Sequence, residues 1–256
     1  MNIIMDSFIS WIGGKKALRK RVLQEFPQAE IYNRYVEVFG GAGWILFSSE
    51  KHAKMEVYND VNGNLVNLFR CVKYHPDAVQ EELQYILISR EQFFDAREQI
   101  QTRGMTDIQR AARFFIIIKE SYGADLHSFG ARPLDLTKAK EYLGVVAKRL
   151  NKVIIENRDF KQILTTYDRE DTLFYLDPPY YEAEKYYSDR FLPKDHVMLK
   201  ETLDNITGKF VLSYNDCDYI RKLYKDYMIV EVDRQHNLMK REIGARYKEL
   251  LVKNFQ

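Results

Sequence analysis

Four residues suited to chemistry, Asp177-Pro178-Pro179-Tyr180, directly follow the apolar run Thr172–Leu176. The run is short and rich in aromatic and long apolar residues, and it ends at two prolines that cannot continue a sheet ladder, so we predict a buried strand. The motif then lies at the carboxyl end of a strand, where open α/β sheets bind their ligands. A carboxylate and a backbone carbonyl can each accept an N–H bond from an exocyclic amine, while a tyrosine ring stacks on a planar base. The alternative is a turn that only ends the strand.

A second candidate binding element is the glycine-rich turn within Val36–Gly43, which follows another apolar run. Glycines let a ligand approach the backbone closely, and helix-terminal N–H groups can face that ligand. A dinucleotide fingerprint beginning at Gly41 requires a third glycine where Leu46 stands, so nicotinamide or flavin binding is disfavoured. Asp60 follows Gly43 by 17 residues, at the end of the next apolar run. A carboxylate at that place can bind the two hydroxyls of a ribose.

Two other short motifs carry weaker signals. In Gly13-Gly14-Lys15-Lys16, a lysine stands where a phosphate-binding loop requires Ser or Thr, so this segment is not such a loop. In Asn157-Arg158-Asp159-Phe160, an acidic residue follows a third apolar run and can lie near an adenine ring at the same sheet edge. An ordinary helix cap is the alternative for Asp159.

Seven short apolar runs are predicted as strands because each ends in a polar or glycine-rich stretch. They are Tyr35–Phe39, Met55–Tyr58, Val153–Ile155, Thr172–Leu176, Phe210–Tyr214, Met228–Val232 and Leu250–Val252. Helical patterns lie between many of them, which favours βαβ units and a mostly parallel sheet in an α/β fold. These patterns are Leu65–Val72, Lys138–Leu150, His196–Asn205 and Asp218–Tyr224. The last runs lie closer together, which favours antiparallel pairing at that edge.

The alternation stops between about Cys71 and Thr137. Helical patterns at Glu91–Gln101 and Ile108–Tyr122 precede an irregular segment there. We therefore predict an inserted, mainly helical subdomain over residues 71–137. The remaining residues, 1–70 and 138–256, then form one catalytic domain.

The composition limits the classes of function. The 256 residues are 46% hydrophobic, which is enough for a substantial core. With 39 basic and 37 acidic side chains, a nucleic-acid surface must be a local patch rather than a global excess of charge. Cys71, Cys217 and the five histidines show no disulfide or metal-ligand spacing, so we expect no metal. Without a signal peptide or a membrane-spanning run, a cytoplasmic protein is expected.

Several motifs occur in the order seen in Dam-type DNA adenine N6-methyltransferases of the D12 class, and the chain resembles that family over nearly its whole length. The motifs are Trp11-Ile12-Gly13-Gly14-Lys15, Glu37-Val38-Phe39-Gly40-Gly41-Ala42-Gly43, Tyr58-Asn59-Asp60, Asp159-Phe160, Asp177-Pro178-Pro179-Tyr180 and Leu212-Ser213-Tyr214-Asn215-Asp216. Residues 249–254 also look like the family's last strand. The glycine-rich turn precedes the catalytic turn, with room for recognition elements between them, which is the order of the family's α group. Val38 stands where relatives often have proline, a conservative departure.

The resemblance implies a Rossmann-like methyltransferase fold that binds S-adenosylmethionine. It places the cofactor against Trp11, Lys15, Phe39, Gly41, Gly43, Asp60, Asp159, Phe160 and Asp177. It assigns the hold on the target adenine to Asp177, Pro178, Pro179 and Tyr180.

The resemblance also implies that the partner is double-stranded DNA, read by the inserted segment. The candidate DNA contacts are His127, Ser128 and Arg132 in its turn-rich part and Arg110, Arg113 and Lys119 on the preceding helix. Arg132 can bond guanine bidentately or touch only phosphate or solvent, whereas the helix cations bind phosphate or keep the surface soluble. Because the target atom is inaccessible inside a duplex, we expect base flipping. The family suggests GATC as recognition site and a monomer or weak dimer.

Two other classes of function stay open on the sequence. Methyltransferases acting on cytosine N4, RNA adenine or protein glutamine use a related turn, although Asp rather than Ser at position 177 and the insert favour DNA adenine. A non-catalytic nucleic-acid-binding protein could also keep this fold. The presence of Asp177, Asp60 and the glycine-rich turn argues against that second class.

Overall fold

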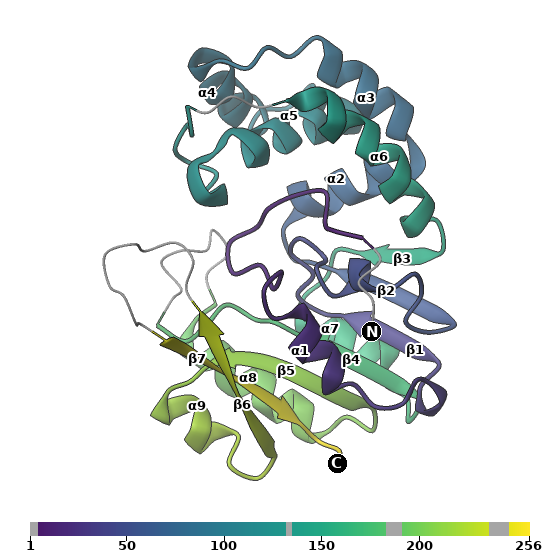
Figure 1. Ribbon diagram of the computed structural model, residues 1–256, viewed down its shortest axis with the longest axis vertical. Helices are drawn as coiled ribbons and strands as arrows, with labels where there is room; N and C mark the ends of the chain where they lie inside the picture. Colours follow the sequence, from purple (N-terminus) through teal and green to yellow (C-terminus); the bar gives the residue numbers. More distant parts are fainter. Residues whose placement is uncertain (1–4, 132–134, 183–190, 236–245) are drawn as a thin grey trace.

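The computed structural model describes residues 5–131, 135–182, 191–235 and 246–256, and a seven-stranded sheet forms its centre (Figure 1). The strands are β1 (Arg34–Glu37), β2 (Met55–Asn59), β3 (Val153–Glu156), β4 (Thr172–Leu176), β5 (Lys209–Asn215), β6 (Met228–Gln235) and β7 (Arg246–Lys253). Their order across the sheet is β3-β2-β1-β4-β5-β7-β6. β7 runs antiparallel to both β5 and β6, and the other neighbours are parallel. The predicted α/β fold, mostly parallel with an antiparallel edge, is confirmed.

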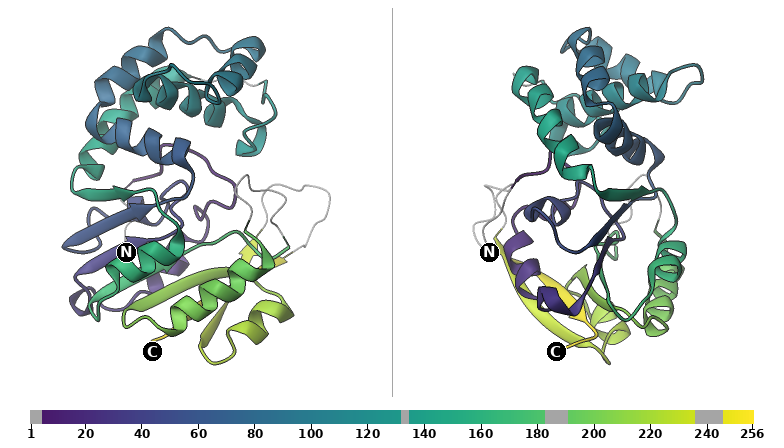
Figure 2. Two further views of the ribbon diagram at one scale, coloured as in Figure 1. Left: turned by 180° about the vertical axis from the view of Figure 1, so that it is seen from behind. Right: turned by 90° about the vertical axis from the view of Figure 1, so that its right-hand side faces the viewer.

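Alternation along the strands gives the sheet two apolar faces. Tyr35 and Leu173 belong to the core on one face, whereas Val36 and Phe174 belong to the core on the other. Figure 2 shows helices on both sides of the sheet. The first face is covered by α1 (Arg19–Gln24) and α2 (Gly63–Tyr74), and the second by α7 (Phe160–Tyr167), α8 (Pro193–Asp204) and α9 (Asp218–Leu223).

Five helices form a region of their own beside the sheet, at the top of Figure 1. They are α2, α3 (Pro76–Gln84), α4 (Arg90–Gln99), α5 (Asp107–Glu120) and α6 (Leu136–Leu150). α5 contacts α2, α3 and α4, and it begins at a capping box in which Thr106 and Gln109 each bond the other's backbone. The helices predicted near α4 and α5 are confirmed, whereas α3, with Pro76 in its first turn, was not predicted. No helix in the described parts of the chain is long and apolar enough to cross a bilayer.

A buried ion pair fastens the helical region to the sheet. Arg149 at the end of α6 donates to both carboxylate oxygens of Glu56 on β2, at 2.7 and 2.9 Å. Its guanidinium also donates to the carbonyls of Leu46 and Ser49. Both ionic side chains are nearly inaccessible to solvent, so each depends on the other for compensation of its charge. The segment that follows the glycine-rich turn is thereby fixed to α6.

Candidate active site

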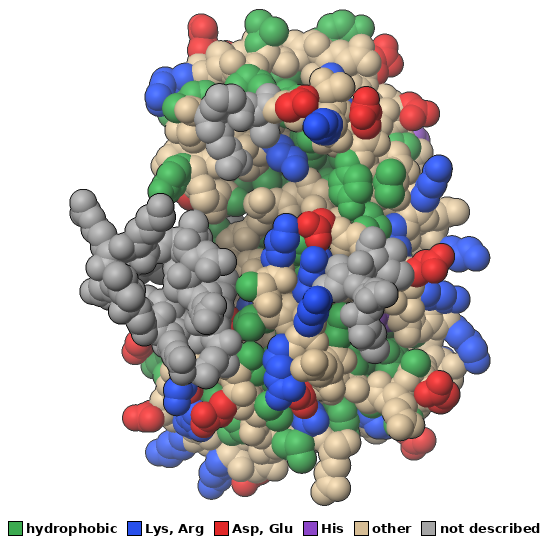
Figure 3. Space-filling model, in the orientation of Figure 1, with side chains coloured by type: hydrophobic (Ala, Val, Ile, Leu, Met, Phe, Trp, Pro, Cys, Tyr) green, Lys and Arg blue, Asp and Glu red, His purple; other side chains and the backbone are tan. Residues whose placement is uncertain are grey.

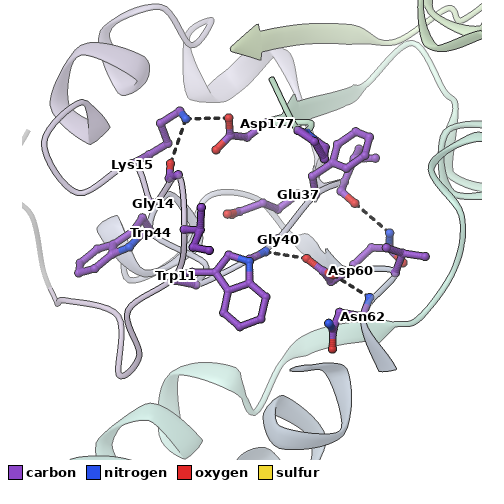
Figure 4. Close-up of a pocket in the computed structure, with 18 of the residues that line it drawn as sticks. Trp11, Gly14, Lys15, Glu37, Gly40, Trp44, Asp60, Asn62 and Asp177 are labelled. Carbon is purple, nitrogen blue, oxygen red and sulfur yellow. Dashed lines mark hydrogen bonds and ion pairs between the residues drawn. The ribbon is translucent and has the colours of Figure 1, made fainter. Parts of the chain in front are cut away.

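A cavity of about 290 Å³ lies at the carboxyl ends of β1, β2 and β4. Its wall combines residues 11–15, 37–42, 59–62, 124–127 and 158–160 with further single residues. The predicted site residues that line it are Trp11, Lys15, Phe39, Gly41, Asp60, His127, Asp159, Phe160, Asp177 and Pro179. Gly43, Pro178 and Tyr180 are chain neighbours of these residues and do not line it. Figure 4 shows Lys15 and Asp177 on one side of the cavity and Trp11, Asp60 and Asn62 on the other.

Lys15 holds Asp177 through a short ion pair, with 2.8 Å between Nζ and Oδ1. The same ammonium donates to the Gly13 carbonyl at 3.1 Å and lies 4.6 Å from the centre of the Tyr180 ring. The Lys15 side chain is only 3% exposed, and a buried ammonium needs such partners because desolvating an unpaired charge is costly. The ion pair therefore fixes the carboxylate of Asp177 at the end of β4.

Glu249 is a second carboxylate beside this lysine, contributed by β7. Its Oε2 lies 3.8 Å from Nζ of Lys15 and accepts the hydroxyl of Tyr180 at 2.6 Å. Antiparallel pairing places Glu249 opposite Asn215 at the carboxyl end of β5, which is the edge where Asp177 also lies. Burial, with the charges of Asp177 and Glu249, raises the pKa of Tyr180 well above its ordinary value. The phenol consequently keeps its proton and donates it to Glu249.

Asp60 shapes the glycine-rich turn from the end of β2. One carboxylate oxygen accepts the N–H of Gly41 and the other that of Asn62, both at 2.8 Å. The hydroxyl of Tyr58 donates to the Gly41 carbonyl at 2.6 Å. Gly41 has a φ of +49°, and a Cβ there would lie 3.0 Å from Cδ1 of Trp11. Both the backbone conformation and the space therefore require glycine at this position.

Asp159 is the helix cap that its sequence allowed, and it also borders the cavity. It is the N-cap of α7, where its side chain accepts the N–H of Lys161 at 2.8 Å, and it also lines the cavity. The next residue, Phe160, stacks on Phe39 with 5.8 Å between ring centres. Phe191 packs against both rings. This end of the cavity is therefore an aromatic wall beside a carboxylate.

Glu37, at the end of β1, is a cavity residue for which the sequence indicated no separate role. Its Oε2 accepts the hydroxyl of Tyr35 at 2.8 Å and the N–H of Leu46 at 2.7 Å. In Figure 4 the side chain lies between Lys15 and Trp11. Burial raises the pKa of Glu37 to about 8, although these two hydrogen bonds oppose the shift. The carboxyl group is therefore mostly protonated at neutral pH.

The model of the D12 class N6 adenine-specific DNA methyltransferase family matches residues 11–238, a span that includes the cavity wall described above. The chain belongs to this family. The match also covers the strands β1 to β6, the helical region and the turn at Asp177, so the resemblance inferred from the motifs is confirmed.

Individual members of the D12 family are similar to the chain over nearly its full length. It is 25% identical to "Type II methyltransferase M1.LlaDCHI" of Lactococcus lactis subsp. cremoris, over 99% of this chain and 96% of that protein. It is also 25% identical to "Type II methyltransferase M.MjaIII" of Methanocaldococcus jannaschii, over 97% and 98%. The "DNA adenine methylase" of Haemophilus influenzae is 22% identical, over 95% and 92%. The similarity is low in identity but spans the whole fold.

The cavity suits S-adenosylmethionine, the donor that methyltransferases generally use. Two acidic side chains, Asp60 and Asp177, border it and can accommodate a cationic ligand. The rings of Phe39 and Phe160 offer an apolar wall to a flat heterocycle. No group of three or more His, Cys, Asp or Glu side chains within the described ranges could hold a metal ion.

Three cations of α5, which were expected either to contact phosphate or to keep the surface soluble, make contacts within the chain itself. Arg110 donates to two backbone carbonyls just beyond α4, at 2.6 and 3.4 Å. Arg113 donates to Oε1 of Gln99 at 2.7 Å. The ammonium of Lys119 lies 5.2 Å from the centre of the Phe115 ring. The two arginines thus join α5 to the end of α4, and these contacts compete with phosphate binding.

The loop after α5 brings two of the other candidates close to the cavity. The N–H groups of His127 and Ser128 both donate to Oδ1 of Asp125, at 2.8 and 2.9 Å. Arg97 on α4 donates to the carbonyl of His127 at 3.1 Å. The loop is therefore held in shape by its own acidic residue and by α4. Arg132 lies outside the described residues.

A basic surface beside the cavity was missed by the sequence reasoning, although the segment 15–21 contains five Lys and Arg residues. Figure 3 shows Lys and Arg side chains gathered near the middle of the face that carries the N-terminal loop and α1. Lys16 and Arg19 lie over the Trp44 ring, at 5.3 and 5.5 Å, and both bind Asp6. Lys20 is exposed next to them. This surface is the kind of local patch that a nearly neutral DNA-binding chain requires.

Proposed function

We propose that this protein transfers a methyl group from S-adenosylmethionine to N6 of adenine at a specific sequence in double-stranded DNA. One observation carries the proposal: Asp177 at the end of β4 borders the same cavity as Asp60 and the glycine-rich turn. An acceptor for an exocyclic amine thus lies beside a site suited to an adenosyl ligand. Membership of the D12 family supports adenine as the target.

The chain's own part in the reaction is to hold and polarise the amine. N6 of adenine is a poor nucleophile because its lone pair is delocalised into the ring, so positioning and electrostatics must supply most of the catalysis. Asp177 and the Pro178 carbonyl each accept one N–H bond, which draws the nitrogen toward tetrahedral geometry. S-adenosylmethionine, when bound, supplies an electrophilic methyl group on a sulfonium. Asp177, oriented by Lys15, also stabilises the positive charge that develops on the nitrogen.

Access to the amine requires the adenine to leave the duplex. Extrusion of a paired base costs a few kcal/mol, and stacking on an aromatic ring returns about 1–3 kcal/mol. Tyr180, next to both amine acceptors in the chain, is the ring that we assign to this stacking.

Recognition is assigned to residues 71–137, which we propose form the target-recognition subdomain. The loop 124–127 borders the cavity, so bases flanking the target pass close to His127 and Ser128. Arg132 is proposed to read guanine. The basic surface at Lys16, Arg19 and Lys20 is proposed to contact the phosphate backbone.

The decisive experiment is a tritium-transfer assay with S-adenosylmethionine and four substrates: duplex DNA, single-stranded DNA, RNA and a mixture of cellular proteins. The expected result is N6-methyladenine in the duplex at one short sequence, located by sequencing the modified bases. Methylated cytosine, RNA or protein would favour the other methyltransferase substrates. DNA binding without transfer would favour the non-catalytic alternative.

Base flipping is tested on the methylated sequence itself. Replacing the partner of the target adenine by an abasic site or a mismatch lowers the cost of unpairing, so affinity should rise. A 2-aminopurine at the target position should brighten on binding as it unstacks. Equal affinity for paired and mispaired targets, without brightening, would favour a substrate that is already unpaired.

A further inference from the structure

Glu249 is a buried carboxylate at the edge of the sheet where Asp177 lies. The proposed mechanism gives this carboxylate no role. It lies on β7, is 2% exposed, and is paired in register with Asn215 on β5 and Val232 on β6. A carboxylate buried to this degree is costly unless charge and hydrogen bonds compensate it. The groups that contact Glu249 must therefore compensate its charge.

Glu249 contacts the two residues that lie around the Asp177 carboxylate. Its Oε2 accepts the Tyr180 hydroxyl at 2.6 Å, and the Lys15 ammonium lies 3.8 Å from the same oxygen. That ammonium also binds Oδ1 of Asp177 at 2.8 Å and lies 4.6 Å from the Tyr180 ring centre. One cation thus lies between two carboxylates and against one ring.

The hydroxyl bond controls the ring because a tyrosine side chain has only two torsions. The phenolic O–H prefers the plane of the ring, because the oxygen is conjugated with it, so an acceptor held at Glu249 favours one rotation of the Tyr180 ring about its long axis. Tyr180 also packs against Tyr214 in a tilted arrangement, with 6.3 Å between the ring centres. This contact restricts rotation of the Tyr180 ring less than the hydrogen bond does. The orientation of Tyr180 therefore depends on Glu249.

We infer that Glu249 is a positioning residue for methyl transfer: through the Tyr180 hydroxyl it sets the plane on which the extruded adenine stacks. The inference rests on the proposed function. It predicts that an acceptor oxygen at position 249, rather than a negative charge, is what the reaction needs. It also predicts that Glu249 and the Tyr180 hydroxyl act as one unit.

The test is a double-mutant cycle on single-turnover methyl transfer with full-length protein, S-adenosylmethionine and the preferred duplex. Glu249→Ala and Tyr180→Phe should each slow transfer by about 10-fold, and the double variant should be no more than about 2-fold slower than Glu249→Ala alone. Glu249→Gln keeps an acceptor and should stay within about 3-fold of the parent. Glu249→Leu replaces Glu249→Ala in the cycle if the alanine variant does not fold.

A matched control exists far from the cavity. Tyr227 donates to Asp204 at the same 2.6 Å, and the corresponding cycle with Tyr227→Phe and Asp204→Ala should leave the rate unchanged. A double variant slowed by the product of the single effects, or a Glu249→Gln variant as slow as Glu249→Ala, overturns the inference. If the parent protein methylates no adenine in the same assay, the proposed function fails instead, so the two failures are distinguishable.

Discussion

The sheet edge beside the cavity and the helical region use their charged side chains differently. On the sheet side, Lys15, Asp177 and Glu249 contact one another around the ring of Tyr180, close to where an amine must be held. On the helical side, the α5 arginines bond to the end of α4. Glu120, at the last position of α5, is 3% exposed, and neither of its oxygens has a hydrogen-bond partner in the described part of the chain. Burial raises the pKa of Glu120 to about 7.

This difference separates chemistry from recognition in physical terms. Fixed, mutually compensated charges at the sheet edge are organised before any ligand binds, which is what electrostatic catalysis requires. The α5 arginines in the helical region instead hold its own packing, which agrees with the proposal that the loops of this region contact DNA. Substitutions at the sheet edge and in the helical region should therefore impair different properties of the protein.

The largest effect is expected at Asp177. Asp177→Ala removes an amine acceptor and the charge that stabilises the transition state, so single-turnover transfer should fall by about 1,000-fold or more. Cofactor affinity, measured by calorimetry, should change by less than about 3-fold, because other strands form most of that site. Asp204→Ala, which deletes an exposed carboxylate on α8, serves as the control. A rate loss below 10-fold would show that Asp177 is not an acceptor for the amine.

Replacing Asp60 should weaken cofactor binding rather than slow turnover. Asp60→Ala removes the acceptor for the N–H groups of Gly41 and Asn62, which frees the turn, and it also removes the ribose acceptor. Hydrogen bonds to charged groups contribute about 1.5–3 kcal/mol, so cofactor affinity should fall about 10- to 100-fold, as measured by calorimetry. Unchanged affinity would show that the ribose is bound elsewhere.

The helical side is tested by comparing two arginines. Arg132→Ala should relax sequence preference by about 1–3 kcal/mol of discrimination, measured as methylation of the preferred site against single-base variants at fixed salt. Arg110→Ala should leave that preference intact and lower the free energy of unfolding by about 1 kcal/mol, because its bonds are internal. A uniform loss across all sites with Arg132→Ala would place that side chain on the phosphate backbone.

The last test concerns a pH dependence of stability at Glu37. Its folded pKa of about 8 lies above the ordinary value of 4.5, so the folded state holds a proton that the unfolded state releases. The resulting stabilisation is complete below the unfolded value and is lost as pH rises through 8. Glu37→Gln removes this dependence. The free energy of unfolding of the variant, relative to that of the parent, should therefore increase by up to about 1.4 kcal/mol per pH unit between pH 5 and 8. Parallel curves from urea titrations would show that Glu37 is ionised in the folded protein.

The strands could be predicted from the sequence because each is a short apolar run ended by a turn signal. Six of the seven predicted runs lie within observed strands, and the first, Tyr35–Phe39, extends two residues past the end of β1. The place of β7 between β5 and β6 could not be predicted, since period-two patterning defines faces and not neighbours. The helix α3 was missed because α2 ends at Tyr74 and Pro76 then reads as the end of a helix, unless it is recognised as the first-turn proline of the next one.

The site could be predicted where a motif is local and not where it depends on tertiary pairing. Asp60, Asp159 and Asp177 follow strand ends, and the rules for open sheets place all three at the cavity. Glu249 stands inside a strand, and its role emerges only from the position of β7. The sequence shows that Arg110 is charged, but it does not show that Arg110 donates to backbone carbonyls within the chain.

The cluster at the sheet edge also determines when activity can begin during synthesis. Lys15 is made early, Asp177 much later and Glu249 later still, and β7 must insert between two strands to bring Glu249 into place. A nascent chain cannot complete this cluster until residue 249 has left the ribosomal exit tunnel. Translation products that stop before residue 249 should therefore transfer no methyl groups.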